Sequence, residues 1–219
     1  VDDSIADGDQ QATFTVEVLD ASSADAYDYV ANQAVTATNT DDETAGFTLS
    51  TTSVSVTEAG GTDTFTVVLD AEPAGDVVIR ASSNDAGEAQ VGGPLTFTDS
   101  NWDTPQTFTI TGVDDDLDDG DQQATFTVEV KDGESDDGYD DVANQSVTAT
   151  NTDDDTVGFT LSTTSVSVAE TGSTATFTVV LDAEPEGDVV IRASSNDAGE
   201  AQVGAPLTFT DSNWDTPQA

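Results

Sequence analysis

The sequence predicts an all-β protein made of tandem, seven-stranded antiparallel β-sandwiches. Short runs of β-branched and aromatic residues alternate with Thr at period two, for example at 64–69 and 106–111. This alternation is typical of strands with one buried face. The chain also repeats itself, because residues 1–10 recur with few changes at 113–122, an offset of 122 − 10 = 112 residues. A fixed period of this length indicates tandem copies of one module.

The same offset holds throughout the chain. The run Gly-Phe-Thr-Leu-Ser at 46–50 returns at 158–162. We therefore expect three parts: 1–44, the C-terminal part of one module; 45–155, a complete module; and 156–219, the N-terminal part of the next. Both outer parts should expose unpaired strands, and exposed strand edges are templates for association. The expected partners are neighbouring copies arranged head to tail, in the same chain or as filament subunits.

Seven strands are expected in the complete module, and no segment has helical periodicity. The expected strands are a broken first strand at 47–49 and 54–56, then 64–69, 77–81, 95–98, 106–111, 124–130 and 146–150. Their inward faces should form the core between two sheets. We expect Trp102 to close one end of that core, and a sugar-stacking platform is the alternative for this residue.

The charge balance excludes several classes of function. The chain carries 45 acidic and 3 basic residues, a net charge of −42, and has neither Cys nor His. Such a surface repels nucleic acid and anionic membranes, so neither is an expected partner. No apolar run is long enough to span a bilayer, and thiol and histidine chemistry are ruled out. Life in high salt and the binding of many cations both favour this composition.

The densest acidic stretch, 113–121, holds six carboxylates without a basic residue nearby. Two unit charges about 4 Å apart repel by roughly 4 kcal/mol at an effective dielectric near 20. A folded loop with several such pairs needs a counter-ion, and Ca²⁺ prefers many hard oxygen ligands. The alternative is an acidic turn that is solvated and binds no ion. Acids also gather at 153–155 and 132–141, whereas outward strand positions are mostly Thr and Ser, which favours ion sites over uniform adaptation to salt.

The strand order suggests that these acids meet. In such a sandwich, Glu58 in the first turn, the 113–121 loop and the module end at 153–155 can lie at one pole. The next module begins at Val157 with almost no linker. Ions held at this pole would fix the junction between modules.

Four motifs, in order, resemble the Calx-beta family. They are Val-Ser-Val-Thr-Glu at 54–58, Leu-Thr-Phe at 95–97, the acidic stretch 114–121 followed by Thr-Phe-Thr-Val at 125–128, and Thr-Asp-Asp-Asp at 152–155. The chain looks most similar to the bacterial and archaeal form found in tandem in very large secreted and surface proteins. The resemblance implies an Ig-like, Calx-beta-type sandwich that binds Ca²⁺ and lies outside the cell or at its surface.

The family's ligands correspond to residues of the complete module and, by the repeat, of the outer parts. Together with their acidic neighbours, the candidate ligands are Glu58, Asp114, Asp115, Asp116, Asp119, Asp121, Asp153, Asp154 and Asp155. The matching residues outside it are Asp2, Asp3, Asp7, Asp9, Asp41, Asp42, Glu43 and Glu170. One family Asp has no clear counterpart, with Asp85 or Glu88 as substitutes, and Gln122 replaces a family Glu. One Ca²⁺ is therefore expected to be weak or missing.

The sequence is compatible with two kinds of function and argues against a third. Tandem modules with Ca²⁺ at their junctions would form a stiff extracellular filament or adhesin stalk, which is the expected function. The alternative is a binding module for glycan, ice or mineral through outward Thr rows such as Thr64, Thr66, Thr107, Thr109 and Thr111. An enzyme is not expected, because the acids lie in polar loops, recur in each module and are too numerous for a defined acid–base pair.

Overall fold

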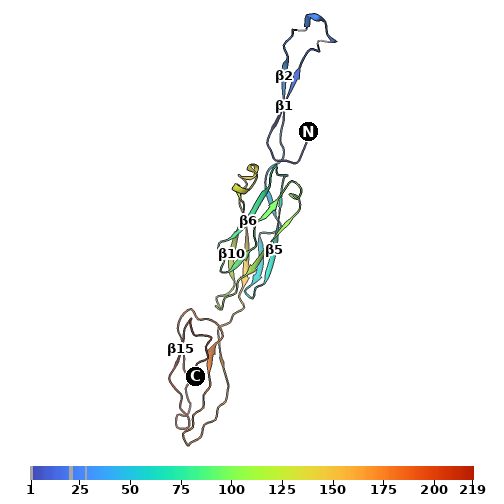
Figure 1. Cartoon of the computed structure of the whole chain (residues 1–219). Coiled ribbons are helices and arrows are strands. Elements are labelled where there is room, and N and C mark those ends of the chain that lie inside the picture. The colour runs from blue at the N-terminus through green and yellow to red at the C-terminus, as the bar shows by residue number, and fades with distance from the viewer. Residues whose placement is uncertain (1, 20–21, 28) are drawn as a thin grey trace.

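The protein is described by a computed structural model covering residues 2–19, 22–27 and 29–219. Figure 1 shows three parts that follow one another along a line, namely a hairpin, a sandwich and a C-terminal part with shorter strands. No helix in the described residues is long and apolar enough to cross a membrane.

Two sheets form the central sandwich. The first has the order β4 (Ser53–Thr57), β11 (Gln145–Thr152), β10 (Gln122–Val130), β6 (Val77–Ser83) and β8 (Leu95–Phe97). The second has the order β3 (Phe47–Leu49), β5 (Thr62–Leu69), β9 (Gln106–Gly112) and β7 (Ala89–Val91). The all-β class and the two-sheet sandwich are thus confirmed.

Two details differ from the expected strands. The broken first strand divides between the sheets: β3 pairs antiparallel with β5, whereas β4 runs parallel to β11. The sandwich is therefore not wholly antiparallel. In addition, β7 pairs with β9 where the sequence predicted no strand. It is only three residues long, too short to show the alternation by which strands are recognised.

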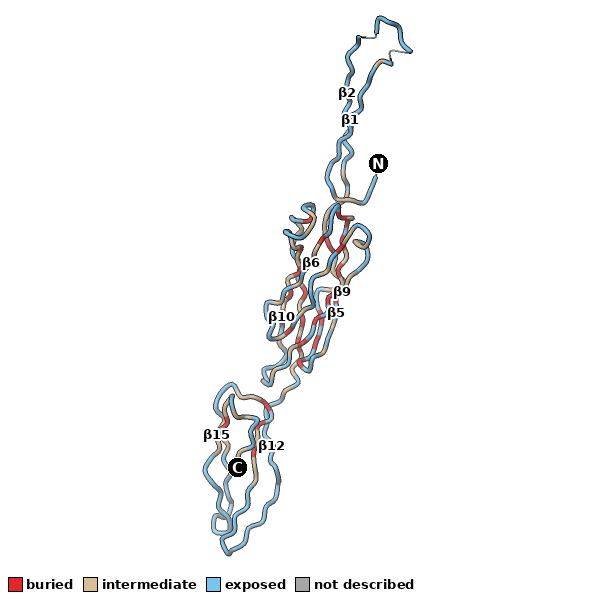
Figure 2. The backbone as a smooth tube through the Cα atoms, in the orientation of Figure 1, coloured by how far each residue is buried: buried red, intermediate tan, exposed pale blue. Residues whose placement is uncertain are grey.

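The core of the sandwich lies between the sheets, where the buried residues gather (Figure 2). Alternate residues of each strand point inward, as in β10, where Ala124, Phe126 and Val128 are all fully buried. Phe65 and Phe108 pair across β5 and β9 with ring centroids 5.3 Å apart. Trp102 packs against this core while remaining half-buried, which agrees with its expected position at one end.

The outer parts repeat fragments of the same architecture. In the first part, β1 (Gln10–Val16) pairs with β2 (Gln33–Asn39), and Phe14 faces Val35 just as Phe126 faces Val147 in the complete module. Phe14 is 57% exposed, whereas Phe126 is fully buried. The last part contains β12 (Phe159–Leu161), β13 (Val179–Leu181), β14 (Val189–Ile191) and β15 (Leu207–Phe209), joined as two separate pairs. Both parts expose apolar residues whose counterparts are buried in the central sandwich.

The end of β9 approaches the end of β4 closely at Gly112. A Cβ atom at Gly112 would overlap the carbonyl oxygen of Thr57 and lie 2.5 Å from the Asn151 side-chain oxygen. Only glycine therefore fits at this position.

We expect Gly112→Ala to lower the free energy of unfolding by roughly 1–3 kcal/mol, the usual cost of overpacking. Urea unfolding of the full chain measures this change. Gly93→Ala is the matched control, because a Cβ atom there meets nothing within 4 Å. Equal stability of the two variants would contradict the close approach.

Candidate calcium site at the module pole

Three segments converge at the pole of the sandwich where the next module begins. Because β4 and β11 are parallel, both end at this pole, and the Glu58 N–H donates to the carbonyl of Thr152 at 3.1 Å. The loop between β9 and β10 reaches the same place. One carboxylate oxygen each of Glu58, Asp153 and Asp155 lies within 4.8 Å of the other two. The structure thus brings together acids from the first turn and the module end.

Glu58 is fully buried, which is unusual for a carboxylate. Its Oε1 lies 3.5 Å from the Asn151 amide nitrogen, and its Oε2 has no hydrogen-bond partner among the described residues. One buried side-chain oxygen each of Glu88 and Asn151 is also unpartnered there. A buried carboxylate without a cationic partner costs several kcal/mol. This set of hard oxygens is what a divalent cation such as Ca²⁺ requires, so the residues fit the expected ion.

The metal-free pole disfavours ionisation of its acids. Burial, reinforced by the negative charges of Asp115 and Asp153, raises the pKa of Glu58 to about 7. Burial likewise raises the pKa of Glu88 and of Asp155, with repulsion from neighbouring carboxylates adding to it. A cation would reverse this effect by stabilising the charged forms.

Carboxylates also organise the acidic loop from within. Asp115 accepts the Leu117 N–H at 2.8 Å, and Asp153 accepts the N–H of Gly120 at 2.7 Å. Gly120 has φ +75°, a left-handed conformation that glycine adopts without strain. Asp121 accepts the Asp153 N–H at 3.3 Å. Each carboxylate offers about four acceptor positions, so these bonds leave others for an ion.

The remaining predicted ligands take different places. Charge repulsion from Asp114 and Asp116 contributes to the raised pKa of Asp155, and repulsion from Asp119 contributes to the raised pKa of Glu88. Asp154 contributes its backbone N–H to the Glu58 carboxylate, and its side chain is not part of the group of three.

Two residues of the site had little or no signal in the sequence. The motifs indicate Glu88 only as a substitute ligand, and they do not indicate Asn151. Glu88 directly precedes β7, the strand that was not predicted, so its approach to the pole was not evident. Asn151 is the last of the core-facing residues of β11, at a position that an apolar residue usually occupies.

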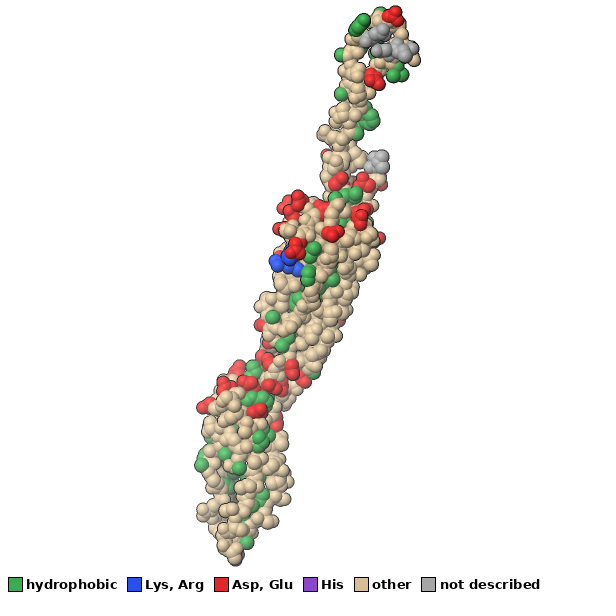
Figure 3. All heavy atoms as spheres, in the orientation of Figure 1, with side chains coloured by type: hydrophobic (Ala, Val, Ile, Leu, Met, Phe, Trp, Pro, Cys, Tyr) green, Lys and Arg blue, Asp and Glu red, His purple; other side chains and the backbone are tan. Residues whose placement is uncertain are grey.

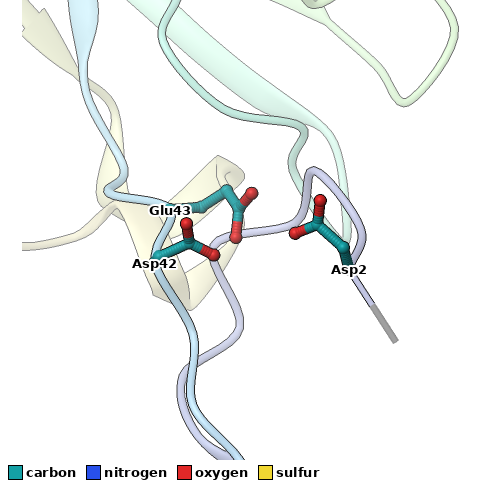
Figure 4. Close-up of side chains that lie close together, drawn as sticks. All are labelled: Asp2, Asp42 and Glu43. Carbon is teal, nitrogen blue, oxygen red and sulfur yellow. The ribbon is translucent and has the colours of Figure 1, made fainter.

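A second acidic group lies at the front junction. Figure 4 shows the Asp42 and Glu43 side chains, which follow β2, together with Asp2 from the opposite segment. One carboxylate oxygen of each lies within 4.8 Å of the other two. By the offset of 112, these residues correspond to Asp114, Asp154 and Asp155.

The other front acids are outside this group of three. Asp41 accepts the N–H groups of Gly8 and Glu43, which lowers its pKa. Asp9 accepts the Asp41 N–H, and Asp3 accepts the Ile5 N–H. Asp7 contributes its backbone carbonyl to Gln10. Glu170, the counterpart of Glu58 in the last part, is exposed and belongs to neither group.

The acids gather at the junctions on the visible surface. In Figure 3, Asp and Glu concentrate in bands at the two ends of the sandwich, and the strand faces between them carry few charges. The chain therefore places its strongest repulsion where consecutive modules meet.

The raised pKa of Glu58 predicts a pH dependence of the metal-free chain. Between pH 4.5 and about 7 the folded state holds a proton that the unfolded state releases, so stability falls as pH rises through this window. The expected loss is roughly 3 kcal/mol for this group. Thermal unfolding in a chelator should therefore give a lower melting temperature at pH 8 than at pH 5.

Glu58→Gln should flatten this dependence and raise the stability of the metal-free chain at pH 8, because it removes the buried charge. Asp99→Asn, which removes an exposed charge elsewhere, is the matched control. The assignment fails if Glu58→Gln retains the wild-type slope between pH 5 and pH 8.

Comparisons with known proteins give only distant structural likenesses. No family model and no curated protein matches the chain. Among solved structures, domains 1–6 of the S-layer protein SbsC match with 13% identity and a TM-score of 0.38, over 92% of this chain and 25% of that one. A PapD-like domain of human CEP192 matches with 14% identity and a TM-score of 0.34, over 50% of this chain and 86% of that one. The E. coli chaperone DraB matches with 11% identity and a TM-score of 0.37, over 66% of this chain and 89% of that one. Scores this low carry no inference about the function of this chain.

Proposed function

We propose that the chain is a run of Calx-beta-type structural modules from an extracellular filament or adhesin stalk, stiffened by Ca²⁺ at the module junctions. The observation that carries this proposal is Glu58, a fully buried carboxylate with an unpartnered oxygen, grouped with Asp153 and Asp155 where the next module begins.

The arrangement of the modules supports a structural role. Consecutive parts follow one another along a line, and only residues 153–158 separate β11 from β12 (Figure 1). Repeats of this kind contact only their neighbours, so the length of the array is set by the number of copies. A stalk of any length can be made from one module.

The ligand chemistry supports Ca²⁺. The carboxylates of Glu58, Asp153 and Asp155 supply hard oxygens, and Asp115 lies close enough to raise the pKa of Glu58. Ca²⁺ takes 6–8 such oxygens in a flexible shell, and extracellular modules commonly bind it with dissociation constants near 10⁻⁴–10⁻³ M. A cation at this pole would cancel the repulsion between the acids and provide the buried oxygens with a partner.

A second candidate function rests on one feature of the outer surface. Three Thr pairs lie opposite one another across β5 and β9: Thr62 with Thr111, Thr64 with Thr109, and Thr66 with Thr107. This regular array is the place where a glycan, ice or mineral surface would bind. Thr109→Lys would abolish such binding in glycan-array or ice-affinity assays of the full chain and would leave Ca²⁺ binding unchanged.

The main proposal predicts that Ca²⁺ stabilises the folded chain. At moderate ionic strength and pH 7.5, millimolar Ca²⁺ should raise the melting temperature in calorimetry, and excess EGTA should remove the increase, because the ion binds only the folded site. Asp155→Asn should increase at least tenfold the Ca²⁺ concentration required for the same rise in melting temperature. Asp99→Asn should respond like the wild type. Identical melting temperatures with Ca²⁺ and with EGTA would refute the proposal.

A further inference from the structure

Both module junctions contain the same backbone contact. Ile5 forms a parallel bridge with Glu72, and Leu117 forms one with Glu184. The N–H of Glu72 donates to the Ser4 carbonyl at 2.8 Å, and the N–H of Glu184 donates to the Asp116 carbonyl at 2.7 Å. Each pair at the second junction lies 112 residues after its counterpart at the first. The contact therefore repeats with the module.

The residues on the loop side differ between the two junctions, although the contact is the same. Asp116 and Asp118 in the second loop are replaced by Ser4 and Ala6 in the first. An aliphatic residue, Leu117 or Ile5, occupies the bridge position in both and is half-buried. The pairing depends on the backbone and on this one apolar side chain, and it tolerates changes in the flanking acids.

In the central sandwich, hydrogen bonds join two segments of the receiving surface. The hydroxyl of the buried Tyr139 donates to the carbonyl of Ala71 beside Glu72. The Asp136 carboxylate accepts the N–H of Gly75 and, at 2.8 Å, the N–H of Gly138. These bonds tie the turn 70–76 to the short 3₁₀ helix η4 (Asp137–Tyr139).

The preceding module touches this helix as well as the turn. A Cβ atom at Gly138 would lie 3.3 Å from the carbonyl oxygen of Ala6. At the second junction, the linker also joins the loop, since the Val157 N–H donates to the Asp118 carboxylate at 2.7 Å. The first junction thus joins a loop of one module to the turn and the helix of the next, whereas the contacts at the second junction involve the turn around Glu184 and the linker.

We propose that the turn 70–76 with helix η4, and the matching turn 182–188 of the last part, form docking surfaces for the acidic loop of the preceding module, and that this docking sets the angle between modules. The proposal deepens the proposed function and rests on it in one respect: the loop that docks is also the loop that lines the ion site. The Asp115 carboxylate accepts the Leu117 N–H, and its negative charge also contributes to the raised pKa of Glu58. Filling the site with a cation would therefore order the docking residues.

The test measures the distribution of distances between two spin labels, one on each side of a junction, by pulsed electron spin resonance on the full chain. The chain has no Cys, so cysteine pairs can be introduced for spin labels without background. Thr109→Cys with Thr208→Cys spans the second junction, and Thr13→Cys with Thr109→Cys spans the first; all three positions are exposed on strands.

Replacing the donor by proline removes the N–H without touching the ion ligands. In saturating Ca²⁺, Glu184→Pro should at least double the width of the distance distribution across the second junction only. Glu72→Pro should do the same across the first junction only. Glu184→Ala and Glu72→Ala keep the N–H and should match the wild type.

Unchanged widths in both proline variants would overturn the proposal. Broadening of both junctions by either variant would also contradict it, since the effect would not be local to one contact. The outcome is separate from that of the calcium proposal: if calorimetry shows no Ca²⁺ binding while each proline variant still broadens its own junction, docking stands and the calcium proposal fails. If Ca²⁺ binds and the distance distributions of the proline variants stay as narrow as that of the wild type, the calcium proposal stands and the docking proposal fails.

Discussion

The parallel pairing of β4 with β11 is the constraint on which the pole of the module depends. It carries Glu58 and Asp153 to the same end of the sandwich, with Thr57 beside Thr152. Gly112 lies against the Thr57 carbonyl and the Asn151 side chain at the same end, where no larger residue fits. A carboxylate that would be solvated in an open turn is thereby buried among other acids, which is costly unless a cation joins them.

This constraint links the charge of the chain to its architecture. A surface of net charge −42 repels its own copies at long range, and salt screens that repulsion only beyond about a Debye length. The acids are nevertheless placed at the junctions, where modules must approach each other (Figure 3). Backbone contacts at Glu72 and Glu184 join the modules at these junctions, and we propose that a bound cation offsets the repulsion between the acids there.

Much of the fold followed from the sequence because alternation and repetition are strong signals. Every expected strand segment of the complete module forms a strand, and Phe65, Phe108 and Phe126 occupy the core. The change of sheet between β3 and β4 was not evident, since a parallel pairing with β11 leaves no local pattern. The meeting of Glu58 with Asp153 and Asp155 at one pole was predicted from the strand order, whereas the positions of Glu88 and Asn151 depend on tertiary placement that residue spacing does not encode. The docking of Leu117 against Glu184 is a backbone contact and had no sequence signal.

The central claim is that a cation lies among Glu58, Asp153 and Asp155. A crystal of the full chain grown with Ca²⁺ and measured at long wavelength tests it through the anomalous difference map. We expect a peak about 2.3–2.6 Å from one oxygen of each of these three carboxylates. A map in which the Glu58 carboxylate faces only water, or in which the three side chains point apart, would contradict it.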